Sequence, residues 1–126
     1  MNEYHPQFWF RAEHVASEFN RQGEACIARW LREQLMKLGY QAAAPEQASW
    51  GQRIRIGGSH TVLVDCAAAR LITDSRSAPP CWIAEVVYEG GIEIPLESNV
   101  AALPTVARVG RDIDAILAAD AQVWYA

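Results

Sequence analysis

Hydrophobic residues recur every three to four positions across residues 13–38, which predicts one long amphipathic helix. The apolar stripe consists of Val15, Phe19, Gly23, Cys26, Ile27, Trp30, Leu31, Leu35 and Leu38. Gly39 stands where a left-handed helix end is expected, behind Lys37 in the last turn. Gly23 inside the stripe costs roughly 1 kcal/mol relative to alanine. We therefore expect either a kink at Gly23 or the close approach of another element.

From Gln52 the hydrophobic period changes to two, which is typical of β-strands. Residues 53–56 and 60–65 are predicted to pair around the turn Gly57-Gly58-Ser59. This pairing places Ile54, Ile56, Val62 and Val64 on one face, and Arg53 and Arg55 on the other.

A second hairpin is predicted from residues 82–88 and 92–96, joined by Glu89-Gly90-Gly91. In this register the residues that face the helices are Trp82, Ala84, Val86, Tyr88, Ile92, Ile94 and Leu96. Glu85, Glu93 and Glu97 face the other way. Pro95 cannot donate a ladder hydrogen bond, so its strand is expected at an edge.

The remaining segments complete the predicted fold. Phe8-Trp9-Phe10 suits either a short strand or an apolar cover over the core. A second helix is expected from Pro104 to Asp120, with a last short strand at residues 122–125. The chain is therefore predicted to be a single α+β domain, residues 1–126, in which two helices pack on one face of an antiparallel sheet of four to five strands.

Composition excludes several classes of protein. The chain has 126 residues, of which 51% are hydrophobic and 21% charged, as expected for one folded domain. The net charge is −4: residues 1–64 carry seven Arg/Lys and six Asp/Glu (+1), and residues 65–126 carry four and nine (−5). We expect no nucleic-acid binding, membrane span or signal peptide, because the sequence has no basic footprint and no long apolar run, and its first ten residues lack signal-peptide regions. Three widely spaced cysteines indicate a reducing, cytoplasmic location.

Candidate catalytic and metal-binding groups have simpler interpretations. His60 and Cys66 lie six residues apart on one expected strand, about 20 Å, which is too far for a nucleophile and its base. His14 and Glu18 are spaced four apart on the expected helix, where a surface pair is favoured over a metal site. The two Gly-Gly pairs precede no helix and are read as turns. Carboxylates at positions 65, 74, 85 and 93 have no spacing that implies acid–base pairing. The sequence therefore predicts no catalytic residue, cofactor or metal.

An acidic face is the feature that most suggests a function. Residues 81–107 contain Glu85, Glu89, Glu93 and Glu97 and no Lys or Arg. Like charges at these positions repel by a few tenths to about 1 kcal/mol each. Either Arg53 and Arg55 on a neighbouring strand offset this repulsion internally, or a basic partner protein does so. Trp82 or Trp50, if exposed nearby, is the expected anchor, and the loop at residues 67–80, with Arg76, is expected to contribute.

The segment spanning about residues 30–88 resembles a group of small, largely uncharacterised bacterial proteins. The shared features are Leu38-Gly39-Tyr40, a proline five residues later, Trp50-Gly51 before an alternating strand, Val64-Asp65-Cys66 and Trp82-Ile83. Ser49 replaces the acidic residue that usually precedes the tryptophan. Some proteins of this group act as immunity partners of secreted toxins, so the resemblance implies such a role, but no functional residues transfer with it.

Together these observations favour a non-enzymatic protein-binding domain that masks a toxin with a basic surface. Two alternatives remain: a small enzyme or ligand-binding domain with a pocket between sheet and helices, and a structural homodimer.

Overall fold

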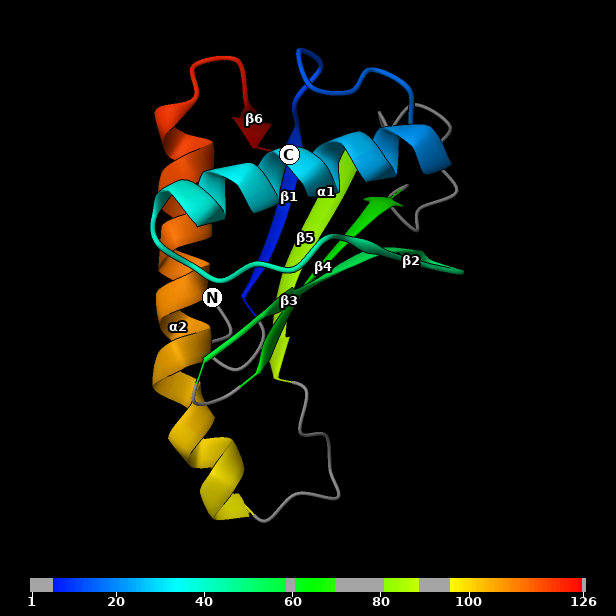
Figure 1. The fold of residues 1–126 in the computed structure, drawn as a ribbon. Coiled ribbons are helices and arrows are strands. Elements are labelled where there is room, and N and C mark those ends of the chain that lie inside the picture. Colours follow the sequence, from blue (N-terminus) through cyan, green and yellow to red (C-terminus); the bar gives the residue numbers. More distant parts are fainter. Residues whose placement is uncertain (1–5, 59–60, 70–80, 89–95, 126) are drawn as a thin grey trace, which may run out of the picture.

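The computed structural model describes residues 6–58, 61–69, 81–88 and 96–125 (Figure 1). Their elements, in chain order, are β1 (Gln7–Arg11), α1 (Arg21–Lys37), β2 (Glu46–Ala48), β3 (Gly51–Ile56), β4 (Val62–Ala69), β5 (Cys81–Tyr88), α2 (Leu96–Ala119) and β6 (Trp124–Tyr125). The predicted α+β class is confirmed.

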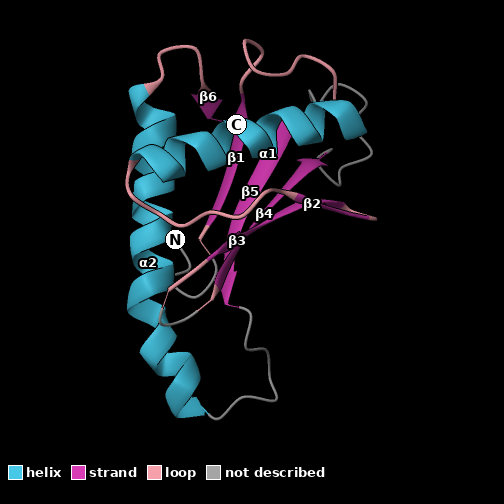
Figure 2. Ribbon diagram, in the orientation of Figure 1, coloured by secondary structure: helices cyan, strands magenta, loops and turns pink. Residues whose placement is uncertain are grey.

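All neighbouring strands are antiparallel, in the spatial order β2-β3-β4-β5-β1-β6. The sheet thus has six strands in the described part of the chain, rather than four to five. Figure 2 shows α1 crossing the strands and α2 running along one side of the sheet. Among the described residues, neither helix combines the length and apolarity needed to cross a membrane.

Both helices pack on one face of the sheet, the inner face. Alternate residues of each strand point to it, because strand side chains have a period of two. Phe8, Trp82 and Val64 from this face share one core cluster with Leu31 of α1 and Ile113 of α2. The space between sheet and helices is filled by these side chains, nearly all of them inaccessible to solvent.

Helix α1 begins at Arg21, so the predicted start at residue 13 is wrong. Asn20 caps it, because its Oδ1 accepts a hydrogen bond from Gly23 N at 2.9 Å. Val15 and Phe19 still pack against the core, but from an irregular segment before the helix. Their spacing therefore predicted burial correctly and helix incorrectly.

The predicted close approach at Gly23 is confirmed. A Cβ at this position would lie 2.0 Å from the carbonyl oxygen of Glu18 and 2.6 Å from Cη2 of Trp82. Phe19 stacks on the same indole, with ring centroids 4.5 Å apart. Only glycine lets α1 pass this close to the sheet.

Strands β3 and β4 form the first predicted hairpin with a register shifted by two residues. Ile54 pairs with Val64 and Ile56 with Val62, and all four side chains are buried on the inner face as expected. The connection spans residues 57–61 instead of three residues. A shift of two preserves the face of every side chain.

The second predicted hairpin is wrong where the described residues test it. Both edges of β5 are occupied, by β4 along its whole length and by β1 at Trp82–Glu85. Leu96 starts α2 instead of ending a strand, and residues 89–95 lie outside the described residues. Helix α2 also begins eight residues before Pro104, which lies inside it. The short strand expected near the C-terminus is confirmed as β6.

Candidate functional site

The outer face of the sheet, which the helices leave uncovered, carries a row of polar side chains from five strands. Cross-strand pairing aligns Glu46 of β2, Arg53 of β3, Asp65 of β4, Glu85 of β5 and Gln7 of β1. Neighbouring members of such a row have Cβ atoms about 4.5–5.5 Å apart and interact directly.

Arg53 and Asp65 form the fixed centre of this row. The guanidinium donates two hydrogen bonds to the carboxylate, Nε to Oδ1 at 2.8 Å and Nη2 to Oδ2 at 2.9 Å. The two side chains are 33% and 18% exposed, so the pair is shielded more than a typical surface pair. This bidentate geometry holds Arg53 in one orientation.

Trp50 lies on Arg53 and is the exposed aromatic residue of this region. Its ring centroid is 5.2 Å from the Arg53 guanidinium carbon, and the residue is 43% exposed. A guanidinium over an indole gains cation–π attraction. Because Asp65 orients Arg53 and Arg53 supports Trp50, the indole is held in position.

Glu85 is the carboxylate next to Asp65 in the row. The two residues are direct cross-strand partners, so like charges face each other. Arg53 bonds Asp65, and Arg55 bonds Glu46 at 3.3 Å. Among the described residues, Glu85 has no hydrogen bond or ion pair of its own. One negative charge on this face is therefore not neutralised by a described neighbour.

Apolar side chains surround the polar row. Trp9, Ile83 and Val87 have outer-face positions and are partly exposed. Leu63, beside Val87, is 3% exposed but lies outside the main core cluster. The outer face therefore combines partly buried apolar groups with fixed charges, the composition of many protein-binding surfaces.

The structure brings Trp50 and Glu85, two of the predicted binding residues, to this one face. Trp82 is a correction: it is fully buried on the inner face, and its Nε1 has no hydrogen-bond partner among the described atoms. Glu97 is also a correction, because it is the second residue of α2 and not part of a hairpin.

The other predicted binding residues lie outside the described residues: Glu89, Glu93 and Arg76. Of the predicted loop at residues 67–80, residues 67–69 belong to β4 and the rest are also outside. In the described part, the predicted four-glutamate face is therefore replaced by the polar row, in which Arg53 bonds Asp65, while Arg55 bonds Glu46 from outside the row.

Sequence reasoning missed the Arg53–Asp65 pair because of the two-residue register shift. A three-residue turn places Arg53 opposite Leu63, whereas the five-residue connection places it opposite Asp65. The favourable pairing of opposite charges at these positions was the signal available for choosing the longer turn.

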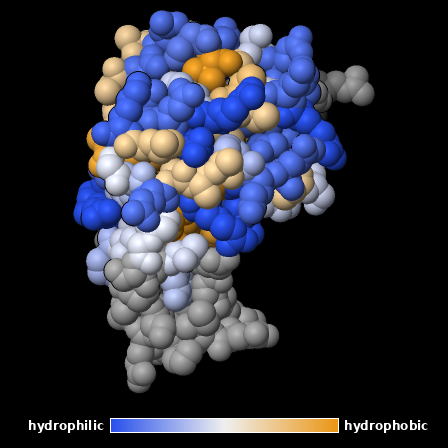
Figure 3. Space-filling model, viewed as in Figure 1, coloured by the Kyte–Doolittle hydropathy of each residue, from blue (hydrophilic) through white to orange (hydrophobic). Residues whose placement is uncertain are grey.

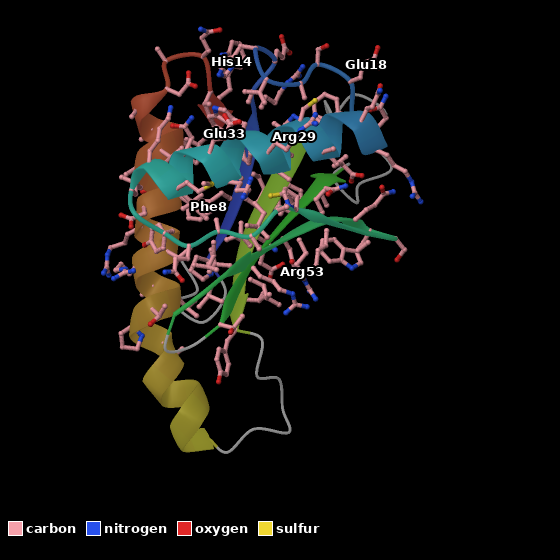
Figure 4. The ribbon with its side chains drawn as sticks, viewed as in Figure 1. Phe8, His14, Glu18, Arg29, Glu33 and Arg53 are labelled. Carbon is pink, nitrogen blue, oxygen red and sulfur yellow. The ribbon has the colours of Figure 1, made fainter. Side chains whose placement is uncertain are left out.

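His14 and Glu18 are not on a helix, and Figure 4 shows their side chains well apart in the segment before α1. His14 Nε2 lies 2.7 Å from Asp120 Oδ2 instead. No group of three or more His, Cys, Asp or Glu among the described residues could hold a metal ion. Burial raises the pKa of the Cys66 thiol to about 12, and it also raises that of Cys81.

No family model matches this chain, and neither a curated protein nor a solved structure does.

Proposed function

We propose that this chain is a non-enzymatic, cytoplasmic protein-binding domain that engages its partner through the outer face of the sheet. The observation that carries the proposal is the Trp50–Arg53–Asp65 arrangement beside Glu85. Tryptophan and arginine are enriched among the residues that dominate binding energy, and a pre-oriented side chain loses less entropy on binding.

The partner that suits this face has a basic side chain opposite Glu85 and a recess for the Trp50 indole. A cation placed there would relieve the repulsion between Glu85 and Asp65. The finer proposal is that the partner is a toxin whose basic site this chain masks, as in immunity proteins. The resemblance across residues 30–88 supports this finer role.

A calorimetric titration against the product of the adjacent reading frame tests the proposal. We expect Trp50→Ala to weaken binding about thirtyfold, the loss of a residue contributing about 2 kcal/mol. Met36→Ala is the control, because Met36 is 47% exposed but lies on α1, which covers the opposite face of the sheet. Equal binding by the wild type and Trp50→Ala would exclude the outer face as the contact.

Glu85→Gln separates binding from folding. We expect weaker binding together with unchanged or slightly higher stability, because the substitution removes a repulsion of a few tenths to about 1 kcal/mol with Asp65. Glu33→Gln, on the exposed side of α1, is the control. Growth of cells that express the neighbouring product, with and without this chain, tests the inhibitor role. A growth arrest that the chain does not relieve would discard that role.

A further inference from the structure

A second candidate site lies in the helical layer, in an open groove between the C-terminal halves of α1 and α2. The groove encloses about 580 Å³, within the roughly 300–1,000 Å³ of small-molecule sites. Trp30 of α1 and Leu38, which caps the end of α1, form one wall. Asp112 and Ile116 of α2 form the other, and Asp120 lies at one end. The helical side of the molecule is mostly hydrophilic, with smaller hydrophobic areas (Figure 3).

The apolar part of the groove is made by Trp30, Ile116 and Leu38. Trp30 and Ile116 are partly buried and packed against the core, so their positions are fixed. Leu38 is 55% exposed. His14 contacts Trp30 edge to face, with ring centroids 6.1 Å apart, and thereby supports the indole from a third segment of the chain. A ligand with an apolar body finds firm contacts here.

The charged part of the groove is more negative than positive. Asp112 and Asp120 are eight residues apart along α2 and its end, about 12 Å for helical geometry. The last turn of α2 has no basic residue, and Asp120 follows it, so a carboxylate adds to the partial negative charge of a helix C-terminus. Lys37 is the one Lys or Arg among the described lining residues.

Hydrogen bonds from other segments hold both carboxylates in place. Asp120 is bonded by Gln122 N at 2.9 Å and contacts His14 Nε2 at 2.7 Å, and these interactions lower its pKa. The Tyr40 hydroxyl donates to Asp112 Oδ2 at 2.5 Å. The other oxygen of Asp112 accepts no hydrogen bond from a described residue, so Asp112 retains acceptor capacity.

From this geometry we infer that the groove binds a small organic cation, an amine with an apolar body. The ammonium group would lie against Asp112 and donate a charge-assisted hydrogen bond. The apolar body would rest on Trp30 and Ile116, where the indole face also attracts the cation. An anion is disfavoured, because it would lie beside two carboxylates and a helix C-terminus, with Lys37 as the one Lys or Arg among the described lining residues. This site is separate from the outer face and does not depend on the proposed protein partner.

Titration of the isotope-labelled full chain, followed by amide and indole NMR shifts, tests the inference with three probes of similar shape. We expect phenethylammonium to shift the Trp30 indole and the amides around residues 112–121 in a saturable way. Neutral 2-phenylethanol should bind at least tenfold more weakly, and phenylacetate should not bind. Hexylammonium, an aliphatic amine, should shift the same residues.

Asp112→Asn should weaken phenethylammonium binding about tenfold, and Asp114→Asn is its matched control. Asp114 is on the same helix and also accepts a tyrosine hydrogen bond, from Tyr125 at 2.5 Å, but it does not line the groove. Asparagine keeps an acceptor oxygen in both variants, and circular dichroism verifies that both fold. Equal affinity in the two variants, equal binding of the neutral probe, or no saturable shift with either amine would overturn the inference.

Discussion

Replacing Gly23 by alanine tests how closely α1 is packed onto the sheet. The added Cβ would lie 2.0 Å from the Glu18 carbonyl oxygen and 2.6 Å from Cη2 of Trp82, both below the 3.0 Å that Cβ atoms tolerate. Trp82 is fully buried, and the carbonyl belongs to the backbone that leads into α1. Relief of the contacts therefore requires movement of a core side chain and of the backbone.

Two opposing effects decide the size of the change. Alanine is favoured over glycine in a helix by about 1 kcal/mol, whereas overpacking a core costs about 1–3 kcal/mol and occasionally more. Because both contacts at Gly23 are severe, we expect overpacking to prevail and stability to fall by about 1–2 kcal/mol. Without these contacts, the same substitution would stabilise the protein.

Urea unfolding followed by helical circular dichroism measures this change. Gln22→Ala, at the exposed neighbouring position, should change stability by less than about 0.5 kcal/mol. Adding Trp82→Phe should reduce the cost of Gly23→Ala, because a phenyl ring lacks the atom that the new methyl group meets. Part of the cost should remain from the Glu18 carbonyl. A Gly23→Ala variant as stable as the wild type would refute the packing described here.

Three further predictions concern single groups. In the native protein, Ellman's reagent should modify the partly exposed Cys26 much faster than Cys66 and Cys81, because these two thiols are buried and their pKa values are raised. Equal reaction rates for all three thiols would contradict this burial. Asp65→Asn should lower the free energy of unfolding in urea by about 1–2 kcal/mol, a value between those of exposed and buried ion pairs. An unchanged free energy of unfolding would mean that the ion pair contributes nothing to stability. Burial, followed by the hydrogen bond to Asp112, raises the pKa of Tyr40 above 10. The resulting contribution to stability is complete below pH 10 and is lost as the pH rises through the folded-state pKa. Tyr40→Phe should therefore remove part of the fall in the urea midpoint at alkaline pH, and a fall identical to that of the wild type would refute this.

The sequence specified local features of the fold better than its long-range pairings. Alternation placed Ile54 and Val64 on the buried face correctly, because the side-chain period of a strand does not depend on which strand lies beside it. The predicted pairing of β5 with residues 92–96 is wrong, because it rests on Gly90-Gly91, a local signal for a turn that joins two successive strands. Nothing local indicates that β1, from the start of the chain, pairs with Trp82–Glu85 instead.

The candidate site was predicted in part for the same reason. Trp50 and Glu85 are predicted from residue type and charge alone, which equally indicate the buried Trp82. Their connection through Arg53 and Asp65 depends on the hairpin register, which a two-residue error conceals. The groove depends on His14, Trp30 and Asp120, which are far apart in sequence. Only the crossing of the two helices brings such residues together.

The position of β1 between β5 and β6 has a consequence for synthesis on the ribosome. Phe10 pairs with Trp82, 72 residues later, and Gln7 with Glu85, 78 residues later, while Tyr125 covers the other side of Phe10. The first strand to emerge must therefore wait for some of the last ones, and such distant contacts slow folding. Its aromatic side chains remain without their final neighbours during most of translation, the interval in which a nascent chain is most prone to aggregate.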